Sequence, residues 1–206
     1  MIVLPDPQGT EEWFAARRGL PSASNADKIL SPTGVPSKQA DAYANQLIAE
    51  RLTGLSGGFE GNAHTARGNE LEPEARAYYE FVTGCVVKQV GFCMADNGQF
   101  GFSPDGMIEG MGLLEIKAPS AAVHIGYLLG GKAPTTYLSQ IQSGLWASKY
   151  VWLDFLSYHP DLPPLHRVVL AAVLPLHADA ADDFQAMIGG DGDEAAVEQG
   201  VQVATE

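Results

Sequence analysis

The stretch Phe102-Ser-Pro-Asp-Gly-Met-Ile-Glu-Gly-Met-Gly-Leu-Leu-Glu-Ile-Lys117 decides the fold, because its pattern is that of two short strands joined by a turn. Residues 107–108 form a short apolar run, and residues 113–117 resume an extended apolar pattern. Between the two runs, residues 109–112 have turn chemistry, since glycine adopts a positive φ without steric cost. We therefore predict a hairpin around which the remaining elements are organised.

Three charged side chains come together if this hairpin forms. Glu115 and Lys117 are two residues apart on a strand, so their side chains point to the same face. Asp105 precedes the first strand, and pairing of the two segments brings it near Glu115. Crowded carboxylates repel one another unless a cation lies between them. That cation is either Lys117, in a structural ion pair, or a hard divalent metal such as Mg²⁺, which prefers oxygen ligands.

The composition of the 206-residue chain is that of a globular protein, with 46% apolar and 18% charged residues. We expect one domain over residues 1–189, followed by an acidic and loose tail over residues 190–206. The sequence has no run of 18 apolar residues and no basic-then-apolar leader, which favours a soluble cytoplasmic protein without a membrane partner. Two cysteines are too few for an iron–sulfur or structural zinc site, and no histidine pair has metal-ligand spacing.

The net charge of −13 argues at first against a nucleic-acid partner, but the distribution of the acids weakens that argument. No Lys or Arg follows Arg167, whereas eight acidic residues do. Residues 1–167 alone contain 12 basic and 17 acidic residues, a net charge of −5. Several of these acids belong to the candidate site, where a bound metal would offset their charge. The acidity therefore lowers the expectation of a nucleic-acid partner but does not remove it.

The rest of the chain predicts helices around a small set of strands, an α/β or mixed α+β layout. A polar lead-in is expected over residues 1–12, a flexible connection over 55–62 and a turn over 160–164. Apolar periodicity and terminal glycines predict helices over 13–19, 20–30, 38–53, 64–83, 120–129, 134–149 and 176–189, and strands over 85–93, 151–158 and 166–173.

Arg17 and Ser24 can be interpreted in two ways. In the first, Arg17 is a surface arginine, and either Ser22 or Ser24 is the N-cap of a short helix. In the second, the guanidinium, a hydroxyl and the amides of a helix N-terminus form an anion pocket that suits a phosphate. The residue types alone do not decide between the two.

Glu72 and Gln140 also have two interpretations each. Glu72 belongs to a run of acids near a helix N-terminus, where carboxylates usually face water, but it flanks the apolar stripe and could look inward toward the strand pair. Gln140 falls on the mostly apolar face of the helix predicted over 134–149. It is either solvated or a buried amide that requires hydrogen-bond partners.

Five motifs in a fixed order resemble the lambda exonuclease family, the YqaJ-like phage alkaline exonucleases of the PD-(D/E)xK nuclease superfamily. The resemblance extends from residue 13 to residue 160. It implies a restriction-endonuclease-like core, with a small mixed central sheet flanked by helices. The motifs are Trp13…Arg17…Ser24, Gly68-x-x-x-Glu72, Ser103-Pro-Asp105-Gly106, Glu115-Ile-Lys117 and Tyr137-x-x-Gln140.

The resemblance implies a Mg²⁺-dependent 5′-to-3′ exonuclease that acts on the ends of double-stranded DNA. Such an enzyme uses two metal ions, with Mn²⁺ as a substitute, and assembles as a ring-shaped homotrimer around the duplex. It leaves a 3′ single strand for a single-strand annealing protein in phage-type recombination, in the cytoplasm of a bacterial host.

The resemblance also implies roles for individual residues. Lys117 would orient or deprotonate the attacking water, and Gln140 would lie near the catalytic centre. Arg17 and Ser24 would hold the 5′-phosphate. The metal ligands would be Glu72, Asp105, Glu115 and the carbonyl of Ile116.

Two alternatives stay open on the sequence. One is another PD-(D/E)xK nuclease, such as a RecB-like enzyme or an endonuclease, and the other is a non-catalytic DNA-binding protein on the same fold. The intact set of Asp105, Glu115 and Lys117 argues against the second alternative. The basic residues that could line a DNA channel include Lys38, Arg51, Arg67, Arg76, Lys132 and Lys149, and the sequence does not select among them.

Overall fold

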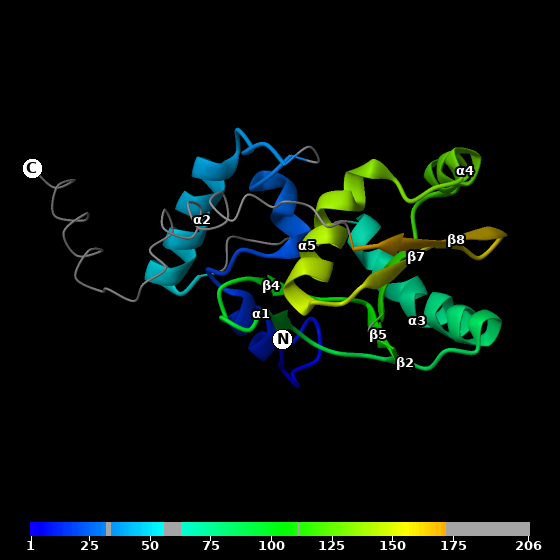
Figure 1. Cartoon of the computed structure of the whole chain (residues 1–206), viewed down its shortest axis with the longest axis horizontal. Helices are drawn as coiled ribbons and strands as arrows, with labels where there is room; N and C mark the ends of the chain where they lie inside the picture. The colour runs from blue at the N-terminus through cyan, green and yellow to red at the C-terminus, as the bar shows by residue number, and fades with distance from the viewer. Residues whose placement is uncertain (32–33, 56–62, 111, 172–206) are drawn as a thin grey trace, which may run out of the picture.

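The computed structural model describes residues 1–31, 34–55, 63–110 and 112–171 (Figure 1). The helix predicted over 176–189, the tail predicted over 190–206 and nearly all of the connection predicted over 55–62 lie outside the described residues. Among the helices of the described part, none combines the length and the apolar character that a bilayer-spanning segment requires.

The predicted hairpin forms the centre of a five-stranded mixed sheet with the strand order β2-β5-β6-β7-β8. β5 and β6 pair antiparallel, and Gly110 in the turn between them has a φ of 84°, which glycine adopts without strain. β6 and β7 pair parallel, whereas the other neighbours are antiparallel. The strands are β2 (Val87–Lys88), β5 (Gly106–Ile108), β6 (Gly112–Lys117), β7 (Trp152–His159) and β8 (Leu162–Leu170).

A second, three-stranded sheet with the order β1-β3-β4 corrects two expectations. The first residues are not a polar lead-in, because β1 (Ile2–Val3) pairs with β3 (Cys93–Met94), which also pairs with β4 (Gly101–Phe102). The strand predicted over 85–93 is wrong as well, since its two ends belong to different sheets. Between them the chain passes closely by the N-terminal segment at Gly91, where a Cβ would lie 1.9 Å from the carbonyl oxygen of Asp6.

The helices predicted within the described residues are present. The short second helix is a 3₁₀ helix, η1, that begins after Ser22. Neither hydroxyl is its cap: Ser22 makes no side-chain capping bond, and Ser24 lies inside the helix. The helices are α1 (Glu11–Arg17), η1 (Ala23–Lys28), α2 (Ala40–Thr53), α3 (Ala63–Thr83), α4 (Ala121–Gly130), η2 (Thr135–Tyr137) and α5 (Leu138–Ser148).

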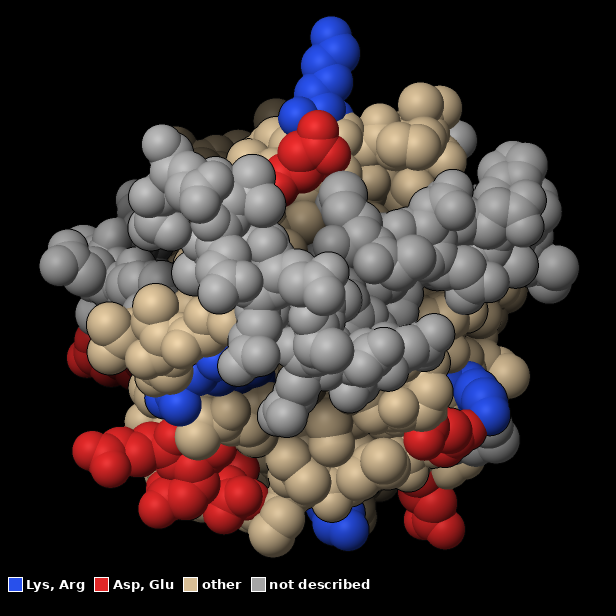
Figure 2. All heavy atoms as spheres, turned by 90° about the vertical axis from the view of Figure 1, so that its left-hand side faces the viewer, with Lys and Arg blue, Asp and Glu red and all other residues tan. Residues whose placement is uncertain are grey.

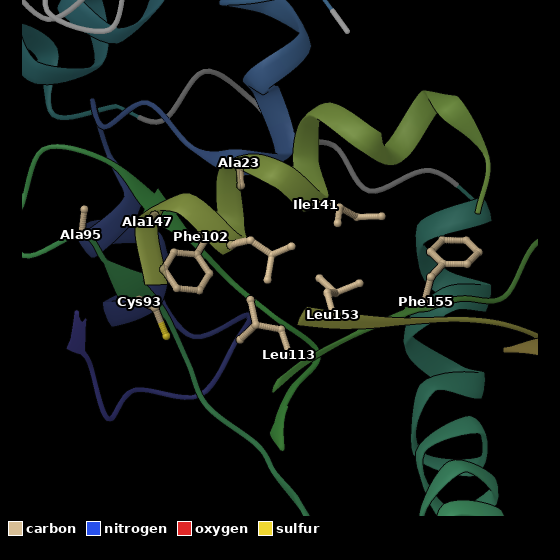
Figure 3. Packing of buried hydrophobic residues seen from close by; sticks show 10 residues of the cluster. Ala23, Cys93, Ala95, Phe102, Leu113, Ile141, Ala147, Leu153 and Phe155 are labelled. Atoms are coloured by element: carbon tan, nitrogen blue, oxygen red, sulfur yellow. The ribbon is translucent and has the colours of Figure 1, made fainter. Parts of the chain in front are cut away.

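Helices α3 and α5 cover opposite faces of the five-stranded sheet, because neighbouring residues of β6 point to opposite sides. Leu113 belongs to the cluster that contains Ile141 of α5, and Figure 3 shows this packing around Leu153. Leu114 belongs to the cluster that contains Ala75 of α3. Both clusters are shielded from water, so the central hairpin is held from both sides and the acidic residues that it carries have a rigid support.

Strand β8 starts earlier than predicted and includes Pro163 and Pro164, so the turn after β7 is shorter than the expected 160–164. Prolines are compatible with this strand because β8 lies at the edge of the sheet, where one row of backbone groups has no strand to pair with. The fully buried His124 of α4 fastens this edge: its Nδ1 lies 2.7 Å from Ser157 Oγ and its Nε2 lies 2.8 Å from the Pro163 carbonyl oxygen.

Candidate active site

Asp105 is fixed against β6 by two hydrogen bonds. Its backbone N–H donates to the Leu114 carbonyl at 3.0 Å, and its carboxylate Oδ2 accepts from the Ile116 N–H at 2.6 Å. Burial, followed by the negative charge of Glu115, raises the pKa of Asp105 well above its ordinary value, although Lys117 acts in the opposite direction. The hairpin thus presents a carboxylate whose charge is unfavourable until a cation joins it.

Glu115 is the most enclosed acid of the site, with 5% of its surface exposed. Its Oε1 accepts a hydrogen bond from Gln140 Nε2 at 2.7 Å and lies 2.5 Å from Lys117 Nζ. Gln140 is half-buried and has a hydrogen-bond partner within the site, which favours the second interpretation of this amide. Lys117 also lies over the ring of Tyr137, with Nζ 5.0 Å from the ring centroid.

The charge state of Lys117 follows from its surroundings. Burial lowers the pKa of the ammonium group, but the negative charges of Glu115 and Asp105 outweigh burial and raise the pKa above its ordinary value of 10.5. Without a metal ion, Lys117 is therefore a cation that is paired with Glu115. As the site stands, it donates hydrogen bonds and positive charge rather than accepting a proton.

Glu72 approaches this group from α3 and faces inward. Its carboxylate is paired with Arg76, one helical turn further along, and 29% of its side chain is exposed. Burial raises the pKa of Glu72, whereas Arg76 lowers it; Glu115 raises it further and Lys117 lowers it. These opposing influences show that Glu72, although it belongs to a helix, shares one electrostatic environment with the two acids of the hairpin.

The chemistry of these donors fits a hard divalent cation. The protein holds one oxygen of each carboxylate with a hydrogen-bond donor. The Ile116 N–H donates to Asp105, and the Gln140 amide donates to Glu115. The Arg76 guanidinium donates to Glu72. In the described ranges, the second oxygen of each carboxylate has no such donor. Among the described residues, no three His, Cys, Asp or Glu side chains lie close enough together to coordinate a metal ion. An ion would therefore require the carboxylates to move closer to one another. Oxygen donors of this kind suit Mg²⁺.

A second group of residues surrounds the guanidinium of Arg17. Nη2 donates to Ser24 Oγ at 3.4 Å and Nη1 to Ser103 Oγ at 3.5 Å, both long contacts. The guanidinium carbon lies 4.2 Å from the centroid of the Trp13 ring, and Trp13 Nε1 donates to Ser103 Oγ at 3.2 Å. Burial lowers the pKa of Arg17. The negative charge of Glu50 acts in the opposite direction, but no carboxylate of the described residues forms an ion pair with Arg17. A guanidinium and two hydroxyls in this arrangement suit an anion.

The two groups belong to one site. Arg17, Ser24 and Ser103 line the same cavity as Glu115 and Gln140. Its volume is about 40 Å³, enough for a few water molecules at roughly 10–15 Å³ each, so a larger ligand would reach the groups from outside. The anion pocket around Arg17 thus lies beside Glu115, one of the three acids that suit a metal.

The sequence did not predict three contacts of this site, which are made by Trp13, Ser103 and Arg76. Trp13 supports the Arg17 guanidinium, and its spacing of four residues on a helix is a signal that sequence reasoning could have used. Ser103 joins the Arg17 group to the turn that carries Asp105, two residues further along. Arg76 is only 8% exposed and pairs with Glu72, so it belongs to the interior rather than to a channel wall.

Basic side chains do not form a continuous surface on the face shown in Figure 2, where the described Lys and Arg residues are separated from one another and several acids gather in one group.

A family model described as the YqaJ-like viral recombinase domain matches residues 12–151. The chain belongs to this family. Two crystal structures of LHK-Exo, an alkaline exonuclease from Laribacter hongkongensis, support the assignment to the YqaJ-like family. One, with dAMP, is 33% identical with a TM-score of 0.77 and covers 95% of this chain and 96% of that chain. The other is 34% identical with a TM-score of 0.78, and the match covers 95% of this chain and 98% of that chain.

A phage-related exonuclease from Haemophilus somnus 129PT shares the fold, at 16% identity and a TM-score of 0.59, over 83% of this YqaJ-like chain and 91% of that chain. Among curated protein sequences, none matches significantly. The predicted resemblance to the lambda exonuclease family is confirmed, and so is the predicted fold class, a PD-(D/E)xK core with small sheets flanked by helices.

Proposed function

We propose that the protein is a Mg²⁺-dependent deoxyribonuclease that digests one strand of linear double-stranded DNA from a 5′-phosphorylated end. The observation that carries the proposal is the shared cavity, in which Arg17 and Ser24 lie beside Glu115 and Gln140. Arg17 and Ser24 would bind the terminal phosphate, and the acidic group at Glu115 would act on the neighbouring scissile phosphodiester. Membership of the YqaJ-like family and the similarity to an alkaline exonuclease support a nuclease role.

The acids of the site would hold the metal. Asp105, Glu115 and Glu72 would be carboxylate ligands, and the Ile116 carbonyl a further one, in a site for two ions that Mn²⁺ could also occupy. When bound, divalent ions stabilise the charge that develops on the phosphate and favour ionisation of a water nucleophile. The crowding that raises the pKa of Asp105 provides the driving force for the site to accept a cation.

The protein's own residues position the reactants. Gln140 holds one oxygen of Glu115, and the Ile116 N–H holds one oxygen of Asp105, so both acids have defined orientations. Lys117, which is charged and next to Glu115, donates a hydrogen bond toward an attacking water or toward the phosphate oxygens. In the metal-free site the charges of Glu115 and Asp105 raise the pKa of Lys117, and ions bound to these acids would weaken that effect.

The polarity of digestion would follow from Arg17. A 5′-phosphate supplies the oxygens with which the guanidinium, Ser24 and Ser103 can form charge-assisted hydrogen bonds, and a 5′-hydroxyl end does not. Binding of the terminal phosphate would place the adjacent phosphodiester over the carboxylates. Repetition of this step removes nucleotides in the 5′-to-3′ direction.

The wider biological setting is a further part of the proposal and rests on family membership. Residues 1–189 would be a single nuclease domain with an acidic tail over 190–206. The enzyme would form a trimeric ring around the duplex in the bacterial cytoplasm and leave a 3′ single strand for an annealing protein during recombination of phage type.

Digestion of a linear duplex that has one 5′-phosphate, one 5′-hydroxyl and a distinct label at each 3′ end, across a titration of Mg²⁺ and Mn²⁺ at alkaline pH, tests this function. We expect metal-dependent loss of the strand that begins with a 5′-phosphate, while its complement stays intact and closed circular DNA is not cut. Cutting of the closed circle would instead indicate an endonuclease. Binding without any digestion over the whole titration would indicate a non-catalytic DNA-binding protein.

A further inference from the structure

Arg76 occupies an unusual position for an arginine. It lies one turn after Glu72 on α3, its Nη2 is paired with Glu72 Oε1, and only 8% of its surface is exposed. Arginine is rarely this buried unless specific partners hold it. The contacts on the other side of its guanidinium therefore decide what the residue does.

Those contacts lead to the sheet. The side-chain amide of Gln89, taken with its oxygen toward Arg76, accepts from Nη1 at 2.7 Å and from Nη2 at 3.0 Å. Gln89 directly follows Lys88, the last residue of β2, and Lys88 pairs with Met107, two residues past Asp105. Arg76 consequently connects the helix that carries Glu72 to the end of β2, which pairs with the strand that directly follows Asp105.

The stability of the fold does not by itself explain this arrangement. Among the described residues, the buried Nε of Arg76 has no hydrogen-bond partner, and an unsatisfied buried donor is unfavourable. A buried ion pair is also often no more stabilising than well-packed apolar side chains. The feature that the pairing does provide is a defined orientation for Glu72, whose carboxylate is otherwise at the end of a flexible side chain.

We propose that Arg76 is a positioning residue: held by Gln89, it restricts the orientation of the Glu72 carboxylate, so that a divalent ion bound by Asp105 and Glu115 recruits Glu72 as a third acidic ligand more readily. This inference rests on the proposed metal site. It differs from the alternative in which Arg76 simply competes with the ion for Glu72. Positioning predicts weaker metal binding when Arg76 is changed, whereas competition predicts tighter binding.

Titration calorimetry with Mn²⁺ on the full-length protein, without DNA, separates these two effects. Arg76→Lys keeps the charge but cannot form the fork between Glu72 and Gln89, and we expect it to weaken Mn²⁺ binding by about 10-fold or more, as for other residues that orient metal ligands. Gln89→Leu should weaken binding in the same direction by a smaller factor. The control Lys88→Gln, which removes a charge at the exposed neighbour of Gln89, should leave the affinity unchanged.

Equal or tighter Mn²⁺ binding by Arg76→Lys would overturn the inference, and tighter binding would identify Arg76 as a competitor. If Arg76→Lys does not fold, as judged by circular dichroism, the exposed position Gln89 decides the question, and unchanged affinity of Gln89→Leu overturns the inference. Absence of Mn²⁺ binding by the unmodified protein would contradict the proposed metal site itself, which is a separate failure.

Discussion

The Ile116 N–H donates to Asp105 Oδ2 at 2.6 Å, which ties the acid that precedes β5 to the strand that carries Glu115. Asp105 is therefore held close to a second carboxylate by the backbone itself. Repulsion between the two is a cost that the fold bears in the absence of a cation.

Substitution Asp105→Asn should separate function from stability. The amide keeps an oxygen for the Ile116 N–H but removes a half-buried negative charge that Glu115 repels, so the metal-free variant should melt at a higher temperature than the unmodified protein. Digestion should fall by at least about 100-fold, since loss of a ligand should exceed the loss of an orienting residue. Mg²⁺ should raise the melting temperature of the unmodified protein much more than that of the variant. A variant that retains full activity would remove Asp105 from the site.

The stability of the metal-free protein should decrease as the pH rises. The pKa values of Asp105 and Glu72 are raised above their ordinary values of 3.8 and 4.5, so the folded state binds more protons than the unfolded chain. Their contribution is fully present below the ordinary values and is lost as the pH rises through the raised values. Urea denaturation with a chelator, from about pH 4 to about pH 9, measures this trend. Asp105→Asn should show a shallower decrease, and an equal slope would contradict the assignment.

Gln140→Leu tests the orientation of Glu115. The substitution preserves the apolar face of α5 but removes the amide that donates to Glu115 Oε1 at 2.7 Å. We expect kcat/KM to fall by about 10- to 100-fold and the Mg²⁺ concentration for half-maximal rate to increase. Gln142→Leu is the matched control, because the Gln142 amide donates to the Leu170 carbonyl at 3.0 Å. Equal effects of the two substitutions would show that Gln140 acts only through the packing of the helix.

His124 should be a structural residue. It is fully buried, and its ring nitrogens lie 2.7 Å from Ser157 Oγ and 2.8 Å from the Pro163 carbonyl oxygen. Replacement by Leu removes the partner of the buried Ser157 hydroxyl and of the Pro163 carbonyl at the sheet edge, which should lower the free energy of unfolding by about 1–3 kcal/mol. Chemical denaturation measures the loss. The neighbouring control Val123→Ala, at a position 45% exposed, should change it by no more than about 0.5 kcal/mol.

The central hairpin and its neighbours could be predicted from the sequence because the signals are local. Glycines define the turn between β5 and β6, and the alternation of β6 places Glu115 and Lys117 on one face. Gln140 could be recognised because an amide on an apolar helix face requires a partner. Each of these inferences depends on residues that are neighbours along one element.

The contacts that could not be predicted depend on partners far apart in the chain. The pairing of Ile2 with Met94 has no local signal in either segment, and it divides the stretch that the sequence presents as a single strand. The link from Arg76 to Gln89 likewise crosses from a helix to a strand end, so the spacing of residues gives no indication of it. Prolines at the start of β8 suggested a turn because an edge position cannot be known before the strand order.

The measurement that tests the central claim most directly is the ratio of kcat/KM for a 5′-phosphorylated duplex to that for the same duplex with a 5′-hydroxyl. We expect a clear preference for the phosphate in the unmodified protein and its loss in Arg17→Ala. The control Lys149→Ala, which removes an exposed charge paired with Asp96, should keep the preference. Arg17→Lys should retain part of the preference, because the charge stays but the planar fork is lost. A ratio near one in the unmodified protein, or a ratio unchanged by Arg17→Ala, would contradict the account.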